Sequence, residues 1–96
     1  VANIWAYLYS VYVIKTDGTL WAWGGNNSGR LGNGGTTAQL TPVQTLSGGV
    51  AQVALPSENT GYARKIDGTI YGWGANTAGQ VGNNSTSTQL TPVQIP

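Results

Sequence analysis

The chain has 96 residues, a formal net charge of +1 and a charged fraction of only 7%. A chain of this length forms one small domain, or a piece of a larger one, because it buries little surface on folding. The absence of Cys and His from the sequence excludes a disulfide, a thiolate nucleophile and a histidine metal ligand. The sequence also lacks the basic cluster that nucleic-acid binding requires, and no apolar run is long enough for membrane insertion.

The first half of the chain predicts four short β-strands. Their expected ranges are Val1–Ala6, Val11–Ile14, Leu20–Trp23 and Thr41–Gln44. The second and third strands are β-branched and aromatic runs separated by Lys-Thr-Asp-Gly-Thr, and an Asp-Gly pair is a strong hairpin signal because Gly tolerates positive φ. Pro42 places the fourth strand at a sheet edge, where its missing N–H costs no ladder hydrogen bond.

The second half of the chain predicts the same series of strands. Their expected ranges are Val50–Leu55, Tyr62–Lys65, Ile70–Trp73 and Thr91–Ile95. No stretch combines helical periodicity with capping residues, so we expect essentially no helix. The predicted fold class is therefore all-β.

The two halves are copies of one unit. Shifting the chain by 50 residues gives 18 identities, of which 17 fall between positions 15 and 44. The segment Gln39–Gln44, QLTPVQ, returns unbroken as Gln89–Gln94. Only Tyr12 and Tyr62 agree in the first fourteen positions, so each unit has a constant part and a divergent part. We therefore divide the single module 1–96 into a first repeat, 1–49, and a second repeat, 50–96.

The third strand of each unit is apolar or small on both faces. In the first unit Trp21 and Trp23 face one side, while Leu20 and Ala22 face the other. A sheet with two such faces must be covered on both, and four-stranded units repeated about every 50 residues are typical of β-propeller blades. We expect the aromatic side chains to pack between blades rather than to form a ligand cage. The predicted blade-packing residues are Trp21, Trp23, Tyr71 and Trp73.

The constant part resembles a known repeat. In both units it reads D-G-T-[LI]-[WY]-x-W-G-x-N-x-x-G-[RQ]-[LV]-G-N, followed by T-P-V-Q. This pattern is similar to the regulator of chromosome condensation repeat, whose members form propellers that usually have seven blades. The repeat occurs twice, and the two copies together cover nearly the whole chain. The resemblance therefore implies two four-stranded antiparallel blades. Members commonly have a Gly-x-x-His-Ser type turn before the second strand, but Ser10 and Thr60 stand where that His would be, so no His-dependent contact is expected.

Two blades alone would expose two apolar outer faces, which a soluble monomer rarely tolerates. We therefore expect the propeller to be completed by other copies of the chain or by repeats outside this sequence. Head-to-tail contacts between identical chains form a ring if the rotation closes and a filament if it does not. The few charges and the absence of a basic tail resemble the secreted bacterial relatives more than the chromatin-bound ones, so we expect an extracellular location.

The divergent part of each unit is the predicted recognition surface. The candidate partner-binding loop residues are Trp5, Tyr7 and Tyr9 in the first unit and Ser57, Glu58 and Asn59 in the second. Aromatic side chains supply rigid contact area, and small polar ones supply adaptable hydrogen bonds. Two hypotheses follow: a scaffold that binds another protein through these loops, or a structural subunit whose main partner is itself. Drift of unconstrained loops would produce the same divergence.

We predict no catalytic, metal or cofactor site. Asp17 and Asp67 lie in identical Lys-x-Asp-Gly-Thr turns, where Asp bonds to the local backbone. The Gly-rich segments after the third strands lack the following helix and the Lys of a phosphate-binding loop. The sequence shows no pattern that assigns a charged partner to Arg30 or Arg64, so we expect both to be exposed, solubilising cations.

Overall fold

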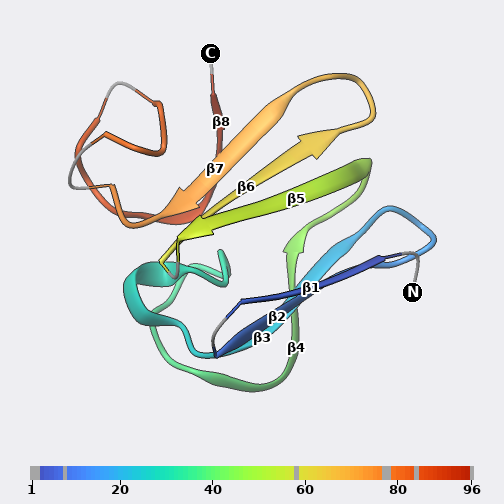
Figure 1. Cartoon of the computed structure of the whole chain (residues 1–96), viewed down its shortest axis with the longest axis horizontal. Helices are drawn as coiled ribbons and strands as arrows, with labels where there is room; N and C mark the ends of the chain where they lie inside the picture. Colours follow the sequence, from blue (N-terminus) through green and yellow to red (C-terminus); the bar gives the residue numbers. More distant parts are fainter. Residues whose placement is uncertain (1–2, 8, 58, 77–78, 84, 96) are drawn as a thin grey trace.

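The computed structural model describes residues 3–7, 9–57, 59–76, 79–83 and 85–95. Within these ranges the chain forms two four-stranded antiparallel sheets, each in simple up-and-down order (Figure 1). The first sheet contains β1 (Asn3–Tyr7), β2 (Ser10–Ile14), β3 (Leu20–Gly24) and β4 (Gln39–Leu46). The second contains β5 (Val50–Ser57), β6 (Thr60–Lys65), β7 (Ile70–Gly74) and β8 (Gln89–Ile95).

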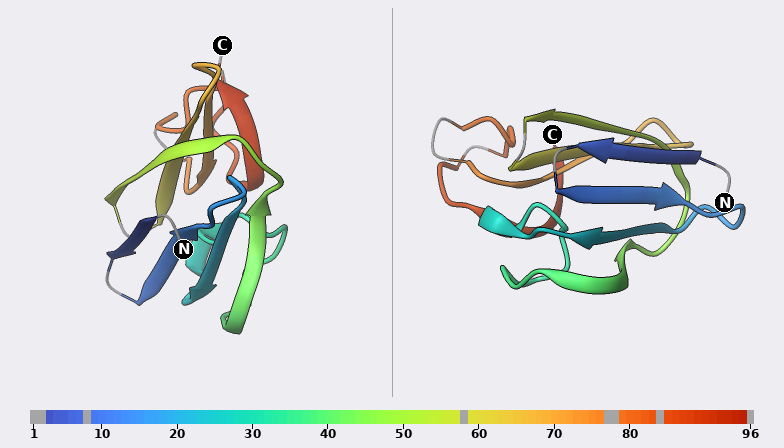
Figure 2. Two further views of the ribbon diagram at one scale, coloured as in Figure 1. Left: turned by 90° about the vertical axis from the view of Figure 1, so that its right-hand side faces the viewer. Right: turned by 60° about the horizontal axis from the view of Figure 1, so that its bottom comes forward.

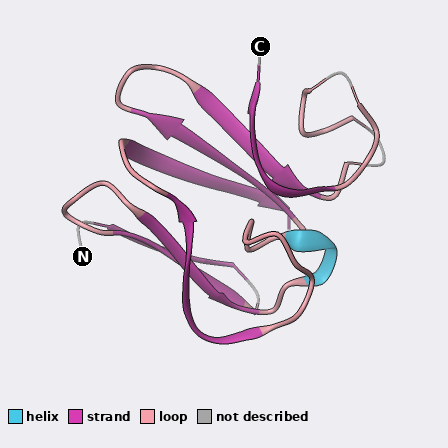
Figure 3. Cartoon of the chain, turned by 180° about the vertical axis from the view of Figure 1, so that it is seen from behind, coloured by secondary structure: helices cyan, strands magenta, loops and turns pink. Residues whose placement is uncertain are grey.

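The all-β prediction is confirmed. Every predicted strand is found, with Val1 and Ala2 of the first lying outside the described residues. Several strands are longer than the apolar run that indicated them, because ladder pairing continues through polar residues such as Gln39 and Gln89. Pro42 lies in β4 and Pro92 in β8, each an edge strand of its sheet, as the edge-strand argument requires. A 3-10 turn, η1 (Asn27–Gly29), follows β3 and lies between the two sheets (Figure 3).

The tight turn between β2 and β3 is held by Asp17. Its Oδ1 atom accepts hydrogen bonds from the Thr19 hydroxyl at 2.6 Å and from the Thr19 backbone N–H at 3.0 Å. These two bonds keep the pKa of the Asp17 carboxyl below its usual range. Asp67 makes the same pair of bonds to Thr69 in the β6–β7 turn, and its pKa is lowered for the same reason. The predicted turn-forming role of both carboxylates is confirmed.

The two sheets are inclined to each other and enclose the core between them (Figure 2). Residues 47–49 connect the sheets, and the Val50 N–H donates to the Gly18 carbonyl oxygen at 3.0 Å, which joins this connection to the β2–β3 turn. The first sheet and its β3–β4 loop contribute Tyr12, Ile14, Leu20, Ala22 and Leu31 to the core, and the second sheet contributes Val50, Val53, Ala63 and Trp73. The core therefore belongs to the interface between the sheets.

Candidate protein-binding surface and the interface between the sheets

Turns and long loops of both sheets meet at one end of the molecule, which we call the loop end (left in Figure 1). Its described residues are Tyr9, Asn59, 25–38, 75–76, 79–83 and 85–88. The Gly25 N–H donates to the Tyr9 carbonyl oxygen at 2.8 Å, and the Ser10 hydroxyl donates to the Gly25 carbonyl oxygen at 2.8 Å. In the second sheet the Ala75 N–H donates in the same way to the Asn59 carbonyl oxygen at 2.8 Å. Each short turn is thus tied to the long loop beside it.

Gly24 and Gly74 make this attachment sterically feasible. Their φ angles are +104° and +99°, a region that favours glycine. A Cβ on Gly24 would clash with the Tyr9 carbonyl oxygen, and a Cβ on Gly74 would clash with that of Asn59. The Trp-Gly dipeptide that ends the third strand of each unit therefore has a direct structural cause.

A buried asparagine organises each long loop. The Asn26 side-chain amide donates to the Asn33 Oδ1 atom at 3.1 Å, to the Gly35 carbonyl oxygen at 3.0 Å and to the Thr37 carbonyl oxygen at 3.1 Å. Its Oδ1 atom accepts from the Leu31 N–H at 2.9 Å. Asn76 repeats this pattern in the second loop. Both side chains are almost fully buried, so these bonds replace bonds to water and fix the loop conformation.

Tyr9 is the most prominent described side chain among the predicted recognition residues. It lies in the β1–β2 turn and is 77% exposed. Its backbone carbonyl is held by Gly25, while its ring remains accessible. Asn59 occupies the matching turn of the second sheet, is half-buried, and has a buried amide oxygen without a hydrogen-bond partner among the described residues.

The other predicted loop residues require a correction. Tyr7 lies in β1, paired with Ser10, rather than in a loop. Trp5 also lies in β1, paired with Tyr12, which agrees with the strand predicted over Val1–Ala6 and not with the loop assignment. The divergence of this segment between the repeats favours a loop, but its backbone pairs with β2 as far as Tyr7 and Ser10. Trp5 is half-buried and packs against the core. Ser57 is likewise the last residue of β5. Glu58 lies outside the described residues, as do the side chains of Tyr7 and Ser57.

Trp73 is the central contact between the sheets. It is fully buried, and its indole N–H donates to the Arg30 carbonyl oxygen at 2.8 Å, from the second sheet to the first. The Tyr12 hydroxyl of the first sheet donates to the same carbonyl oxygen. One carbonyl therefore joins the second strand of one sheet to the third strand of the next. Burial raises the pKa of the Tyr12 hydroxyl to about 12, because the phenolate would lose its hydration.

Arg30 is buried, which contradicts the expected exposed cation. Only 3% of it is exposed, and its Nε atom donates to the Gly25 carbonyl oxygen at 2.9 Å. The guanidinium packs so closely on Gly25 that a Cβ at that position would clash with it. In the second unit Ala75 takes the place of Gly25 and Gln80 takes the place of Arg30. The two differences between the repeats are therefore sterically related. Arg64 is exposed, as expected.

The remaining predicted blade-packing aromatics occupy different environments from Trp73. Trp21 is half-buried near the β2–β3 turn, with the Lys15 ammonium 4.3 Å from its ring centroid and its indole N–H donating to the Thr19 hydroxyl at 2.8 Å. Tyr71 has the Lys65 ammonium 4.8 Å from its ring centroid. Trp23, the counterpart of Trp73, is half-buried on the side of the first sheet that faces away from the second.

Metal binding and membrane spanning have no candidate among the residues described. No group of three or more His, Cys, Asp or Glu side chains gathers there. Within the same ranges, no helix has the length and apolar character needed to cross a membrane.

The family model for the Regulator of chromosome condensation (RCC1) repeat matches residues 17–60 and 67–96. Both matches begin at the Asp-Gly turn of a sheet, and the first one runs through β3, β4 and β5 to the start of β6. The sequence unit of the family is therefore shifted relative to the sheet. No curated protein matches the chain in sequence.

Solved structures share the fold of the chain at low sequence identity. Human WBSCR16 matches with a TM-score of 0.86 and 22% identity over 99% of this chain. Prp20p from Saccharomyces cerevisiae, described with its binding properties to Gsp1p and histones, matches with a TM-score of 0.80 and 20% identity over 98%. A structure of Kap60 bound to yeast RCC1 (Prp20) contains a match with a TM-score of 0.76 and 22% identity over 92%.

The chain spans only 25%, 23% and 21% of these three structures. At this identity the similarity shows the fold, which is that of β-propeller blades. The two sheets are two consecutive blades, and the interface around Trp73 is a contact between blades.

Proposed function

Because the chain belongs to the regulator of chromosome condensation (RCC1) repeat family, we propose that its two blades form part of a non-enzymatic propeller that binds a protein partner through the loop end. The observation that carries this proposal is the 77% exposed Tyr9 ring on a hydrogen-bonded turn. An exposed aromatic on a rigid frame provides contact area at low entropic cost, which is why tyrosine is common at protein interfaces.

The position of Tyr9 in the repeat supports this role. The loop end combines a constant frame, built on Asn26 and Asn76, with turns whose sequences differ between the two blades. Rigid scaffolds with variable loops are a common arrangement for recognition. Prp20p, which shares the fold, is a protein with described binding to Gsp1p and histones. We extend only the general property, protein binding, to this chain.

A comparative capture experiment tests the proposal. The tagged chain and a Tyr9→Ser variant would be used as baits, with Lys15→Ser as the control because Lys15 is an exposed residue at the opposite end of the blade. We expect specific protein partners to be retained by the chain and by the control but reduced at least tenfold with Tyr9→Ser. Equal capture by all three baits would show that the Tyr9 turn is not the recognition surface.

A second candidate function is a structural subunit that assembles head to tail. The observation that favours it is the difference between equivalent residues on inner and outer sides: Trp73 is fully buried, whereas Trp23 is only half-buried. The outer side of the first blade thus carries, in Trp23, the counterpart of the residue that joins the blades within the chain.

A further inference from the structure

Leu90 joins the second blade to the long loop of the first. It lies near the start of β8, and a Cβ on Gly29 would come within 2.6 Å of its Cδ2 atom. The Gly34 N–H donates to the Leu90 carbonyl oxygen at 2.8 Å, so the backbone of β8 is attached to the same loop. Only 36% of Leu90 remains exposed. The β3–β4 loop of one blade is therefore the receptor for a leucine of the next blade.

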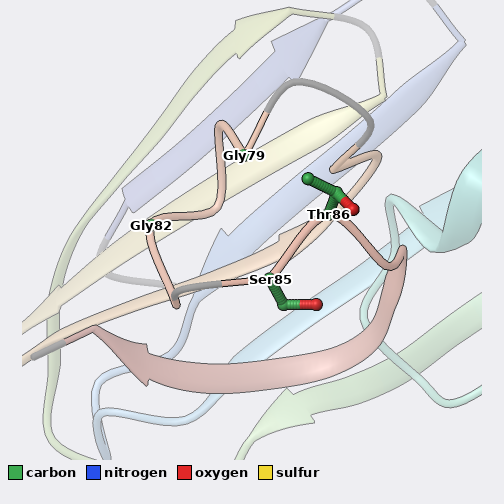
Figure 4. Close-up of a pocket in the computed structure, with 4 residues that line it drawn as sticks. All are labelled: Gly79, Gly82, Ser85 and Thr86. Atoms are coloured by element: carbon green, nitrogen blue, oxygen red, sulfur yellow. The ribbon is translucent and has the colours of Figure 1, made fainter.

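The matching loop of the second blade has the same construction but holds no such leucine among the described residues. Its Gly82 N–H donates to the Gly79 carbonyl oxygen at 3.1 Å, as the Gly32 N–H does to that of Gly29 at 2.9 Å. Four described residues of this loop, Gly79, Gly82, Ser85 and Thr86, line an open hollow of about 590 Å³ (Figure 4). The closest heavy atom to a Cβ on Gly79 would be the Ser85 carbonyl oxygen at 3.9 Å.

The opposite side of the chain carries the corresponding leucine. Leu40 occupies the position of Leu90 in the repeated QLTPVQ segment and is 95% exposed. Ile4 on the same blade is 60% exposed, whereas Val53, which has the equivalent place in the strand register, is 2% exposed in the contact between blades. The outer side of the first blade thus presents the inserting residues, and the outer side of the second blade presents the receptor.

We propose that a second copy of this chain docks head to tail, with its Leu40 in the hollow between Gly79 and Thr86. The contact is heterologous, because different surfaces of the two copies meet, and it repeats the geometry of the blade interface inside the chain. It uses the sides of the blades rather than the Tyr9 turn, so this proposal rests on the second candidate function, head-to-tail assembly, and is independent of loop-end recognition.

Two differences between the blades make the contact between chains weaker than the contact within the chain. Gly61 lies against the Trp73 ring, and a Cβ there would come within 2.7 Å of it, whereas Val11 stands opposite Trp23 in the first blade. The outer side of the second blade also has Arg64 in the place of the buried Ile14. We therefore expect a reversible association that depends on concentration.

Sedimentation equilibrium of the 96-residue chain tests the proposal, with Leu40→Asp as the disrupting variant. Tyr9→Asp is the matched control, since it places the same charge on another highly exposed apolar residue. We expect the chain and the control to exceed the monomer mass of 10.0 kDa as concentration rises, and Leu40→Asp to raise the dissociation constant at least tenfold. A chain that stays monomeric at millimolar concentration, or a Leu40→Asp variant that associates like the control, would overturn the proposal.

Disulfide trapping tests the predicted pairing of surfaces directly. The chain has no Cys, so a Leu40→Cys chain mixed with a differently tagged Thr86→Cys chain introduces one thiol on each partner. With oxidised glutathione added as the oxidant, which is reduced to glutathione as the two protein thiols join, we expect the mixed disulfide to form at least tenfold faster than in a mixture of Tyr9→Cys and Thr86→Cys chains. Equal rates in the two mixtures would contradict the docking of Leu40 into the hollow, and would leave repeats of a longer polypeptide as the natural neighbours.

Discussion

Replacing Asn26 by Asp should strongly destabilise the chain. The change preserves the shape of the side chain but removes the amide donors that serve three acceptors, the Asn33 Oδ1 atom and two carbonyl oxygens, at 3.0 to 3.1 Å. Each lost bond costs about 1 kcal/mol, and three acceptors would then face a buried carboxylate, so we expect a loss of about 3–5 kcal/mol at neutral pH. For a domain of this size that is a large share of the total stability, which is on the order of 5–15 kcal/mol.

The assay is urea denaturation followed by tryptophan fluorescence at a fixed protein concentration, compared with Asn33→Asp as the control. Among the described residues Asn33 forms hydrogen bonds only through its Oδ1 atom, which accepts from Asn26 and from the Gly35 N–H. The control therefore keeps these bonds and should lose less than about 1 kcal/mol. Burial should raise the folded-state pKa of the carboxyl introduced at position 26 above its unfolded value, so the deficit should shrink as the pH falls. A deficit below about 1 kcal/mol, or one equal to that of the control, would refute the proposed role of Asn26.

Two further predictions concern the blade interface. Trp73→Phe removes the indole hydrogen bond to the Arg30 carbonyl and part of a fully buried ring, so it should lower the free energy of unfolding in urea by about 2–3 kcal/mol. Trp23→Phe should lower it by less than about 1 kcal/mol. Equal losses would contradict the assigned interface. The folded-state pKa of Tyr12, about 12, lies above its ordinary value of 10.0. The contribution of the protonated hydroxyl to the free energy of unfolding is therefore complete below pH 10 and is lost as the pH rises through 12. We expect up to about 3 kcal/mol of alkaline destabilisation that a Tyr12→Phe variant lacks; identical pH profiles would refute this assignment.

Much of the fold could be predicted from the sequence because the same strand and turn signals occur in both repeats. The Asp-Gly turns, the aromatic third strands and the edge position of Pro42 follow from local stereochemistry. The repeat length and the double-sided apolar strands then indicate blades. The divergence of the first segment between the units favours a loop assignment for Trp5 and Tyr7, although Trp5 also lies in the strand predicted over Val1–Ala6. Strand pairing depends on backbone bonds and tolerates divergent side chains.

The contacts between the blades cannot be read from local pattern. The burial of Arg30 depends on Gly25, which leaves space for a guanidinium, and on a carbonyl that accepts from two distant side chains. Asn26 and its copy Asn76 recur in the sequence, yet recurrence alone does not distinguish a buried hydrogen-bond centre from a polar loop residue. The repeated QLTPVQ segment indicates a strand, but the difference in exposure between Leu40 and Leu90 arises only once the blades are packed.

Hydrogen exchange of the tryptophan indole protons tests most directly whether the two blades pack as described. The chain has four tryptophans, so their indole signals can be assigned by single substitutions and followed by NMR at low concentration in the Leu40→Asp background. We predict that the Trp73 indole proton, buried and bonded to the Arg30 carbonyl, exchanges far more slowly than that of Trp23. Equal and rapid exchange at both positions in a folded chain would contradict the blade interface on which this account rests.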